Sequence, residues 1–273
     1  MTPPGEASAL ARVLAIARRD AAVQLSYRFG LLARFTEVGV TATTLFFISK
    51  LVGNPEQLAP YRGDYFAFAL IGAVIISFAT LGLGAFSRTI SDEQQAGSLE
   101  VLLSVPAPLS VILAGTFVVP LALTALEVLV YAVIAASLGI RFSFGAIALA
   151  LPALALTIAG FCALGVLSAA LIVLTKRGDP VTLVAARATA VLAGSLFPIS
   201  VLPGWLQAVA KLVPAYYGLQ AMRSALLAGA GLRDIAGDLV VLGGFAVVLV
   251  PLSLACFARA VGVARVSGTL GTY

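Results

Sequence analysis

Four charged residues lie inside or beside long apolar runs: Arg34, Glu37, Glu127 and Arg187. Such side chains can pair with one another, take up a proton or contact a polar substrate. A charge at the centre of a membrane helix costs about 2.5 to 3.5 kcal/mol, so each needs a partner, a wet cavity or a function. Arg34 and Glu37 have a helical spacing at which they can pair. We expect that pair near the membrane interface, at a shallower depth than a proton relay needs.

Glu127 and Arg187 are the two charges that most need a partner, because apolar residues surround both of them along the chain. Three interpretations stay open. The two side chains pair with each other, they line a polar cavity, or they contact the substrate of a translocation path. The sequence alone does not give their depth in the membrane.

Several kinds of chemistry are excluded by residues that the chain lacks. It has no histidine, which rules out Ser-His-Asp hydrolysis and histidine-ligated zinc or haem. No glycine is followed by lysine, so the GxxxxGK phosphate loop is missing. Cys162 and Cys256 fall in apolar runs, where thiols act as small packing residues. We expect no catalytic, cofactor or metal site, so energy for pumping must come from an ion gradient or another polypeptide.

The composition predicts an all-α integral membrane protein with a single transmembrane domain over residues 1–273. Hydrophobic residues make up 61% of the chain and charged residues 11%, whereas soluble domains have about 25% charged residues. A membrane helix needs about 20 apolar residues. Six runs reach that length, at 35–52, 65–86, 107–138, 146–175, 181–201 and 239–258.

The basic residues predict the orientation of these spans. More than thirty residues with several arginines precede the first span, and the segment lacks the cleavage site of a secretory signal. By the positive-inside rule this start is cytoplasmic, and six crossings return the C-terminus to the same side. Residues 7–29 show apolar residues at helical spacing, which predicts a helix along the cytoplasmic interface. That helix either anchors in lipid alone or also contacts a cytoplasmic partner.

Residues 88–106, between the second and third spans, are too polar to cross a membrane. Ser91, followed by two acids and a glutamine, is typical of a capped helix start, and Gly97 can end a short helix. Leu99, Leu102 and Leu103 then offer an apolar face. The pattern predicts a short, acidic, rigid helix between two spans, able to transmit motion by packing.

Two segments resemble type 2 ABC exporter permeases, the ABC-2 transporter family. The first resembles the family pattern E-x-x-x-G-T-L-E-x-L-L-x-x-P, with serine in place of its threonine. Its matching residues are Glu93, Gly97, Ser98, Leu99, Glu100, Leu102, Leu103 and Pro106. The second resembles F-P-x-x-x-L-P-x-W-L, followed by P and R-x-x-L-x-G. Its matching residues are Phe197, Pro198, Leu202, Pro203, Trp205, Leu206, Pro214, Tyr217, Arg223, Leu226, Leu227 and Gly229.

The resemblance implies a half-transporter of six helices that pairs with a second copy of itself. Two cytoplasmic ABC ATPase subunits would bind ATP and Mg and drive transport through the path. Membrane lipids would surround the two permease copies. The stretch after the second span would be the helix that couples to the ATPase. Its residues in this chain are Asp92, Glu93, Gly97, Ser98, Leu99, Glu100 and Leu103.

Residues 197–238 predict a re-entrant outer hairpin or two short interfacial helices. Several prolines break the segment, and non-helical backbone at membrane depth needs protein or water around it. Phe197, Pro198, Trp205 and Tyr217 are candidates for the path or its gate, although aromatic residues also mark an ordinary outer interface. The resemblance implies that Arg223 anchors this hairpin rather than clamping a substrate.

Two functions remain from the sequence. The favoured one is the permease of an ATP-driven exporter in the inner, plasma membrane, with both termini cytoplasmic, moving a lipid, a glycolipid or polysaccharide, or a hydrophobic drug. The alternative is a proton-coupled carrier in which Glu37 and Glu127 take up protons without an ATPase. The net charge of +5 fits anionic headgroups, and we expect no nucleic-acid partner.

Overall fold

The computed structural model describes residues 9–53, 56–61, 63–95, 109–140, 142–175 and 180–266, and within them every regular element is helical. Five of these helices are long and apolar enough to cross a membrane. They are α2 (Arg28–Val52), α3 (Tyr65–Gln95), α5 (Leu109–Ser137), α6 (Phe144–Thr175) and α10 (Leu232–Val266). The prediction of an all-helical, multi-pass membrane protein is confirmed.

The fifth predicted span, 181–201, is helical over only part of its length. The helix α7 (Pro180–Leu192) has 13 residues. At 1.5 Å per residue that is about 20 Å, less than the ~30 Å of a bilayer's hydrocarbon core. Beyond α7 the chain turns at Gly194, which has a φ of 67°, and is extended at Pro198. The apolar run continues through this turn, which is why hydropathy predicted a longer helix, and the count of six spans stays a prediction.

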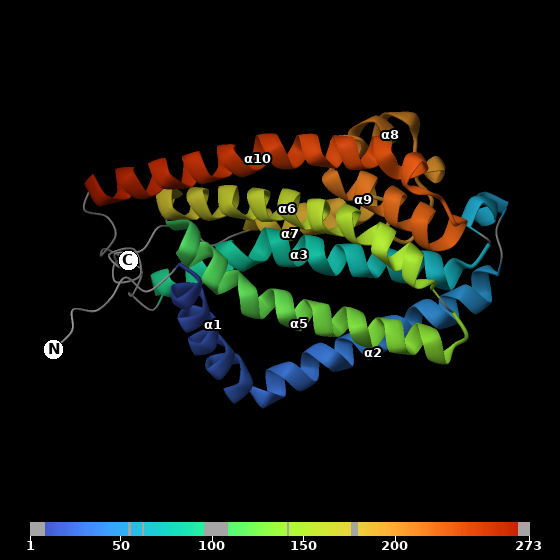
Figure 1. Cartoon of the computed structure of the whole chain (residues 1–273), viewed down its shortest axis with the longest axis horizontal. Helices are drawn as coiled ribbons and strands as arrows, with labels where there is room; N and C mark the ends of the chain where they lie inside the picture. The colour runs from blue at the N-terminus through green and yellow to red at the C-terminus, as the bar shows by residue number, and fades with distance from the viewer. Residues whose placement is uncertain are drawn as a thin grey trace.

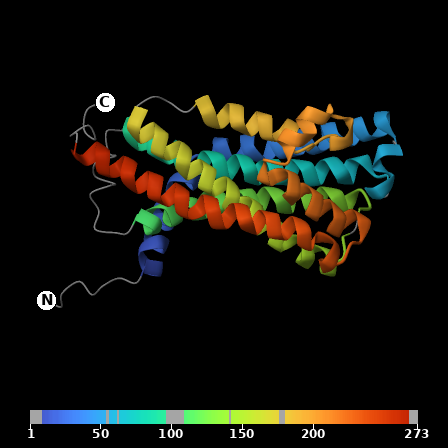
Figure 2. The same ribbon diagram turned by 90° about the horizontal axis from the view of Figure 1, so that it is seen from above.

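The long helices form an elongated bundle around α6, which packs against α3 on one side and α10 on another (Figure 1). Seen from above, α7 and α10 lie on opposite sides of these central helices (Figure 2). The C-terminal end of α3, the N-terminal end of α5 and the helix α1 (Ala9–Ser26) lie at one end of the bundle. The short helices α8 (Gly204–Ala210) and α9 (Pro214–Arg223) lie at the other.

The crossing of α3 and α6 depends on small residues. A Cβ atom added to Gly165 would lie 2.1 Å from the carbonyl oxygen of Gly82, and one added to Gly82 would lie 2.7 Å from the Cβ of Phe161. The two backbones therefore approach closely at a place where only glycine fits. Such contacts are the usual way for membrane helices to associate, because lipid removes the hydrophobic drive between them.

The N-terminal helix α1 ends before the predicted boundary at residue 29. Tyr27 leaves the helical conformation, with φ −89° and ψ 63°, and α2 begins at Arg28. The helix α1 packs against α5, where Ile16 faces Gly115 so closely that an added Cβ would lie 2.8 Å from the Ile16 Cβ. Leu10 and Leu14 on α1 are exposed. The helix α1 is therefore packed against the bundle through α5, while part of its apolar surface stays exposed.

Residues 193–231, which we call the broken segment, connect α7 to α10. After the turn at Gly194 come the 3-10 turn η2 (Ile199–Val201), α8, α9 and the π-helical turn η3 (Ser224–Ala228). Gly229 ends η3 in the left-handed conformation, with a φ of 70°. The last helix then begins at Leu232, so the final seven residues of the predicted outer segment, 197–238, belong to α10.

Candidate functional site

Arg223, the last residue of α9, is buried, with 4% of its surface exposed. Its Nη1 donates a hydrogen bond to the carbonyl oxygen of Gly194 at 2.9 Å. Its Nη2 donates to the carbonyl oxygens of Ser195 at 2.7 Å and Phe68 at 3.1 Å. The guanidinium carbon also lies 3.4 Å from the centre of the Phe68 ring. One side chain thus joins α9, the start of α3 and the turn after α7, as an anchor of this segment would.

Two glycines make room for this arrangement. A Cβ atom on Gly72 would lie 1.9 Å from the carbonyl oxygen of Ser195 and 3.1 Å from the Nη2 of Arg223. Gly194 adopts a φ of 67°, a conformation that other residues rarely take. The role of Gly72 could not be predicted from the sequence, because a glycine in an apolar span has no distinguishing pattern until its neighbour in space is known.

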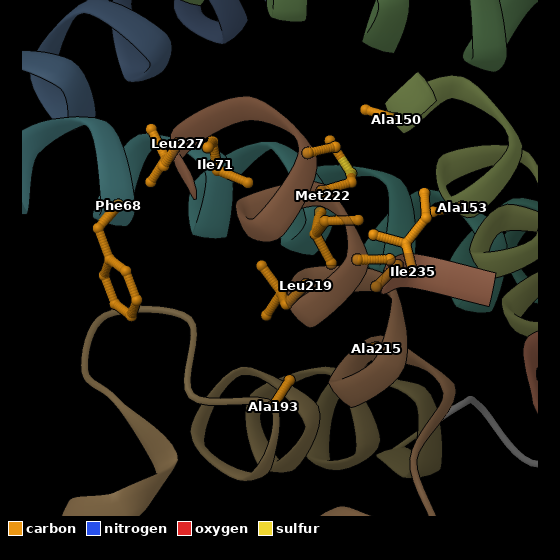
Figure 3. Packing of buried hydrophobic residues seen from close by; sticks show 14 of the residues in the cluster. Phe68, Ile71, Ala150, Ala153, Ala193, Ala215, Leu219, Met222, Leu227 and Ile235 are labelled. Carbon is orange, nitrogen blue, oxygen red and sulfur yellow. The ribbon is translucent and has the colours of Figure 1, made fainter. Parts of the chain in front are cut away.

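The helix α9, which ends at Arg223, is held in place by apolar packing. Leu219 and Met222 of α9 belong to one buried cluster with Phe68 and Ile71 of α3 and with Ala193. Figure 3 shows the side chains of α9 among those of these neighbouring elements. Gly218 on the same helix faces Thr157 of α6, where an added Cβ would lie 2.2 Å from the Oγ1. The broken segment is therefore a packed part of the protein.

A cavity of about 270 Å³ adjoins Arg223 at this end of the bundle. Residues of the 3-10 turn η1 (Glu56–Tyr61), α3, η2 and α9 line it. The lining residues are Pro60, Tyr61, Phe68, Ala193, Pro198, Ile199, Ser200, Tyr216, Leu219, Gln220 and Arg223. The cavity thus combines a cation, two phenols, a hydroxyl and an amide with apolar walls, which is the composition of a ligand pocket.

The electrostatics of this cavity are positive. Burial lowers the pKa of the Arg223 guanidinium to about 9, and nearby Tyr61 and Tyr65 oppose that shift, so the group stays a cation at neutral pH. Burial also raises the pKa of the Tyr216 phenol, and neighbouring Tyr217, Asp238 and Tyr61 raise it further. The Tyr216 hydroxyl therefore keeps its proton and remains a hydrogen-bond donor.

The predicted path or gate residues of the broken segment lie at this end of the bundle, but only one of them lines the cavity. Pro198 lines it. Phe197 is half-buried, and Trp205 is 69% exposed at the start of α8. Tyr217 packs against the rings of Tyr216 and Phe245 instead. Their role in a path stays a prediction.

The charges inside the spans pair differently from the expectation. Arg34 of α2 donates from Nε to the carboxylate of Glu127 on α5, and from Nη2 to the Thr124 hydroxyl at 3.0 Å. The expected Arg34–Glu37 pair is not formed among the described residues, because Arg34 is engaged by Glu127 and Glu37 is exposed on α2. Of the three interpretations left open for Glu127 and Arg187, pairing with each other is not observed, since Glu127 pairs with Arg34 and Arg187 is exposed on α7. Arg34 and Glu127 are 93 residues apart in the sequence, so helical spacing could not predict this pair.

The predicted coupling region is only partly within the described residues. Asp92 is exposed near the C-terminal end of α3. The expected helix start at Ser91 was wrong, because α3 continues as one helix to Gln95, and residues 91–95 contain no glycine or proline that would interrupt it. The side chain of Glu93 and the residues Gly97, Ser98, Leu99, Glu100 and Leu103 lie outside the described part of the chain.

Comparison with known proteins adds one match to this geometry. The model of a family described as ABC-2 type transporter matches residues 12–227, a stretch that begins in α1 and ends in η3. A comparison with curated proteins finds no significant match. The matched stretch contains α2, α3, α5, α6 and α7, the Arg34–Glu127 pair and the anchoring arginine.

Proposed function

Because this chain belongs to the ABC-2 type transporter family, and is thus a permease subunit of a transporter, we propose that it forms the path of an ATP-driven exporter. A second copy of the chain would complete the path, and two cytoplasmic ABC ATPase subunits would bind ATP and Mg and supply the work. We place the protein in the inner, plasma membrane with both termini in the cytoplasm.

The observation that carries this proposal is the match over residues 12–227, read together with the two unlike ends of the bundle. At one end, α1, the C-terminal end of α3 and the N-terminal end of α5 lie together (Figure 1). Residues 96–108 connect α3 to α5 and contain most of the proposed coupling motif, which begins at Glu93 near the end of α3. At the other end lies the broken segment with its cavity. This difference between the two ends fits a permease whose ATPase binds at the first end and whose substrate leaves the path at the second.

The cargo that fits this proposal is amphiphilic: a lipid, a glycolipid or polysaccharide, or a hydrophobic drug. The large exposed apolar surface of α2 and α10 supports a membrane route, with Phe47 and Val247 among its most exposed residues. In the proton-coupled alternative, Glu37 and Glu127 would be the proton acceptors, and Glu127 would have to give up its pair with Arg34 of α2.

The coupling proposal is tested by charge reversal at the two ends of the molecule. We expect Glu100→Lys, in the coupling motif, to abolish substrate-stimulated ATP hydrolysis in the complex of purified permease and ATPase. The matched control is Glu56→Lys, an exposed glutamate of η1 at the opposite end. If both variants keep the stimulation, or if no ATPase copurifies with the chain, the proposal is wrong.

A further inference from the structure

The cavity beside Arg223 has a positive charge that no acid among the described residues neutralises. The ionisable groups that act on the guanidinium are the phenols of Tyr61 and Tyr65, and no carboxylate of the described chain is among them. Three carbonyl oxygens accept hydrogen bonds from Nη1 and Nη2, whereas Nε has no partner among the described residues. A buried charge is costly without an opposite one, so an anion in this cavity would be stabilised.

The polar groups around the cavity suit a compact anion. Tyr61, Ser200, Tyr216 and Gln220, which carry hydroxyl or amide groups, line it together with Arg223. All of these can donate hydrogen bonds to anionic oxygens. Asp238 of α10 acts on Tyr216, and Asp64 accepts a hydrogen bond from the backbone N–H of Ala67 at the start of α3, but neither lines the cavity. Among the described residues, the lining therefore contains hydrogen-bond donors and one cation, and no acid.

The size of the cavity limits the ligand to a small group. Pockets for drug-sized molecules hold about 300 to 1,000 Å³, and this cavity holds about 270 Å³. A phosphate or carboxylate with a few attached atoms fits such a volume. A whole lipid or an extended glycan does not, so the remainder of a larger ligand would have to lie outside the cavity.

The chain that continues from the lining residues of η2 presents exposed apolar side chains that can receive an apolar tail. Val201 follows the lining residue Ser200 and is 64% exposed, and Leu212 between α8 and α9 is 72% exposed. Trp205 is exposed on the same segment, and exposed Lys211 adds a second positive charge. Apolar side chains beside lysine and tryptophan are typical of protein surfaces at the boundary between headgroups and acyl chains.

We propose that the cavity formed by η1, the start of α3, η2 and α9 binds the anionic phosphate or carboxylate headgroup of a membrane amphiphile, with its tail along the exposed surface of η2 and α8. Arg223 supplies the opposite charge, and Tyr61, Ser200, Tyr216 and Gln220 supply hydrogen bonds. The site needs neither an ATPase nor transport, so it goes beyond the proposed function and can be tested on the purified chain.

The ligand class is tested by native mass spectrometry and thermal unfolding of the full chain in neutral detergent. Three probes separate the possible sources: dihexanoyl phosphatidic acid, dihexanoylglycerol with the same tails and no charge, and inorganic phosphate. We expect the phosphatidic acid to bind at least about tenfold more tightly than either of the others, a difference of about 1.4 kcal/mol. Equal binding of dihexanoylglycerol would overturn the role of charge, and equal binding of inorganic phosphate would overturn the role of the tail.

The location of the site is tested by a variant that spares the anchoring arginine. Gln220 is exposed at the cavity, so Gln220→Glu changes charge with almost no change in shape. A carboxylate there would pair with Arg223 and repel the ligand, and we expect the affinity for phosphatidic acid to fall at least about tenfold. The control is Gln24→Glu, the same change at an exposed position of α1 at the far end of the bundle. Unchanged affinity in Gln220→Glu, or an equal loss in Gln24→Glu, would overturn the proposal.

Discussion

Gly72 of α3 lies against the carbonyl group of Ser195, so closely that a Cβ atom at residue 72 would come within 1.9 Å of the carbonyl oxygen. The same oxygen accepts a hydrogen bond from Arg223 at 2.7 Å. The close approach of two backbones therefore sets the position of an acceptor for a buried cation. The fit of α3 against the broken segment and the position of Arg223 depend on the same contact.

This contact predicts that Gly72→Ala destabilises the protein. The added methyl group must push the Ser195 carbonyl away, and overpacking of this kind costs about 1 to 3 kcal/mol. Thermal unfolding in detergent measures the effect. The control is Gly243→Ala on α10, where nothing lies within 4 Å of an added Cβ. There alanine should be neutral or slightly stabilising, because it favours the helix over glycine. Equal melting temperatures for the two variants would contradict the close contact.

The pair between α2 and α5 predicts a second, different effect. Glu127→Gln leaves Arg34 without its opposite charge, and we expect a loss of about 1 to 3 kcal/mol in the free energy of unfolding. The cost is below that of a fully buried pair because the Arg34 side chain is 33% exposed. Unfolding in denaturant measures it.

The exchange of the two charges tests whether the loss comes from this pair. The double variant Arg34→Glu with Glu127→Arg restores opposite charges between α2 and α5, so it should recover part of the stability that each single variant loses. Glu37→Gln is the control, since Glu37 is exposed on the same helix. A double variant no more stable than the worse single variant would show that the two side chains do not interact.

The contact between α1 and α5 predicts a rescue experiment. Gly115→Ala places a Cβ 2.8 Å from the Cβ of Ile16, so α1 should separate from the bundle. Limited proteolysis within α1 should then become faster. The double variant Gly115→Ala with Ile16→Gly removes the clashing Cβ together with the rest of the Ile16 side chain and should slow the cleavage again. Faster cleavage that the second substitution fails to reverse would mean that α1 is held by other contacts.

Hydropathy was sufficient to predict the long helices, because each crossing must be apolar over most of its length. It could not predict the end of α7, since the run from Val191 to Leu202 stays apolar while the backbone turns at Gly194. It also placed the start of the last span at residue 239, seven residues late. Asp234 and Asp238 made those residues look like a loop, although they form the first turns of α10.

The site was harder to predict than the fold. The resemblance indicated an anchoring role for Arg223, and the side chain does contact three carbonyl groups from two distant segments. Its acceptors are backbone atoms, which leave no residue type in the sequence to recognise. The Arg34–Glu127 pair was missed for a related reason, since periodicity reports neighbours along one helix and this pair joins two.

Transport in proteoliposomes that contain the permease with or without its ATPase tests most directly whether the chain is the path of an ATP-driven exporter. A labelled amphiphile should move against its gradient only when the ATPase and ATP are both present. Dissipating a proton gradient should then leave the rate unchanged. Uphill movement by the permease alone, driven by an imposed proton gradient, would contradict the account and would identify the chain as an ion-coupled carrier.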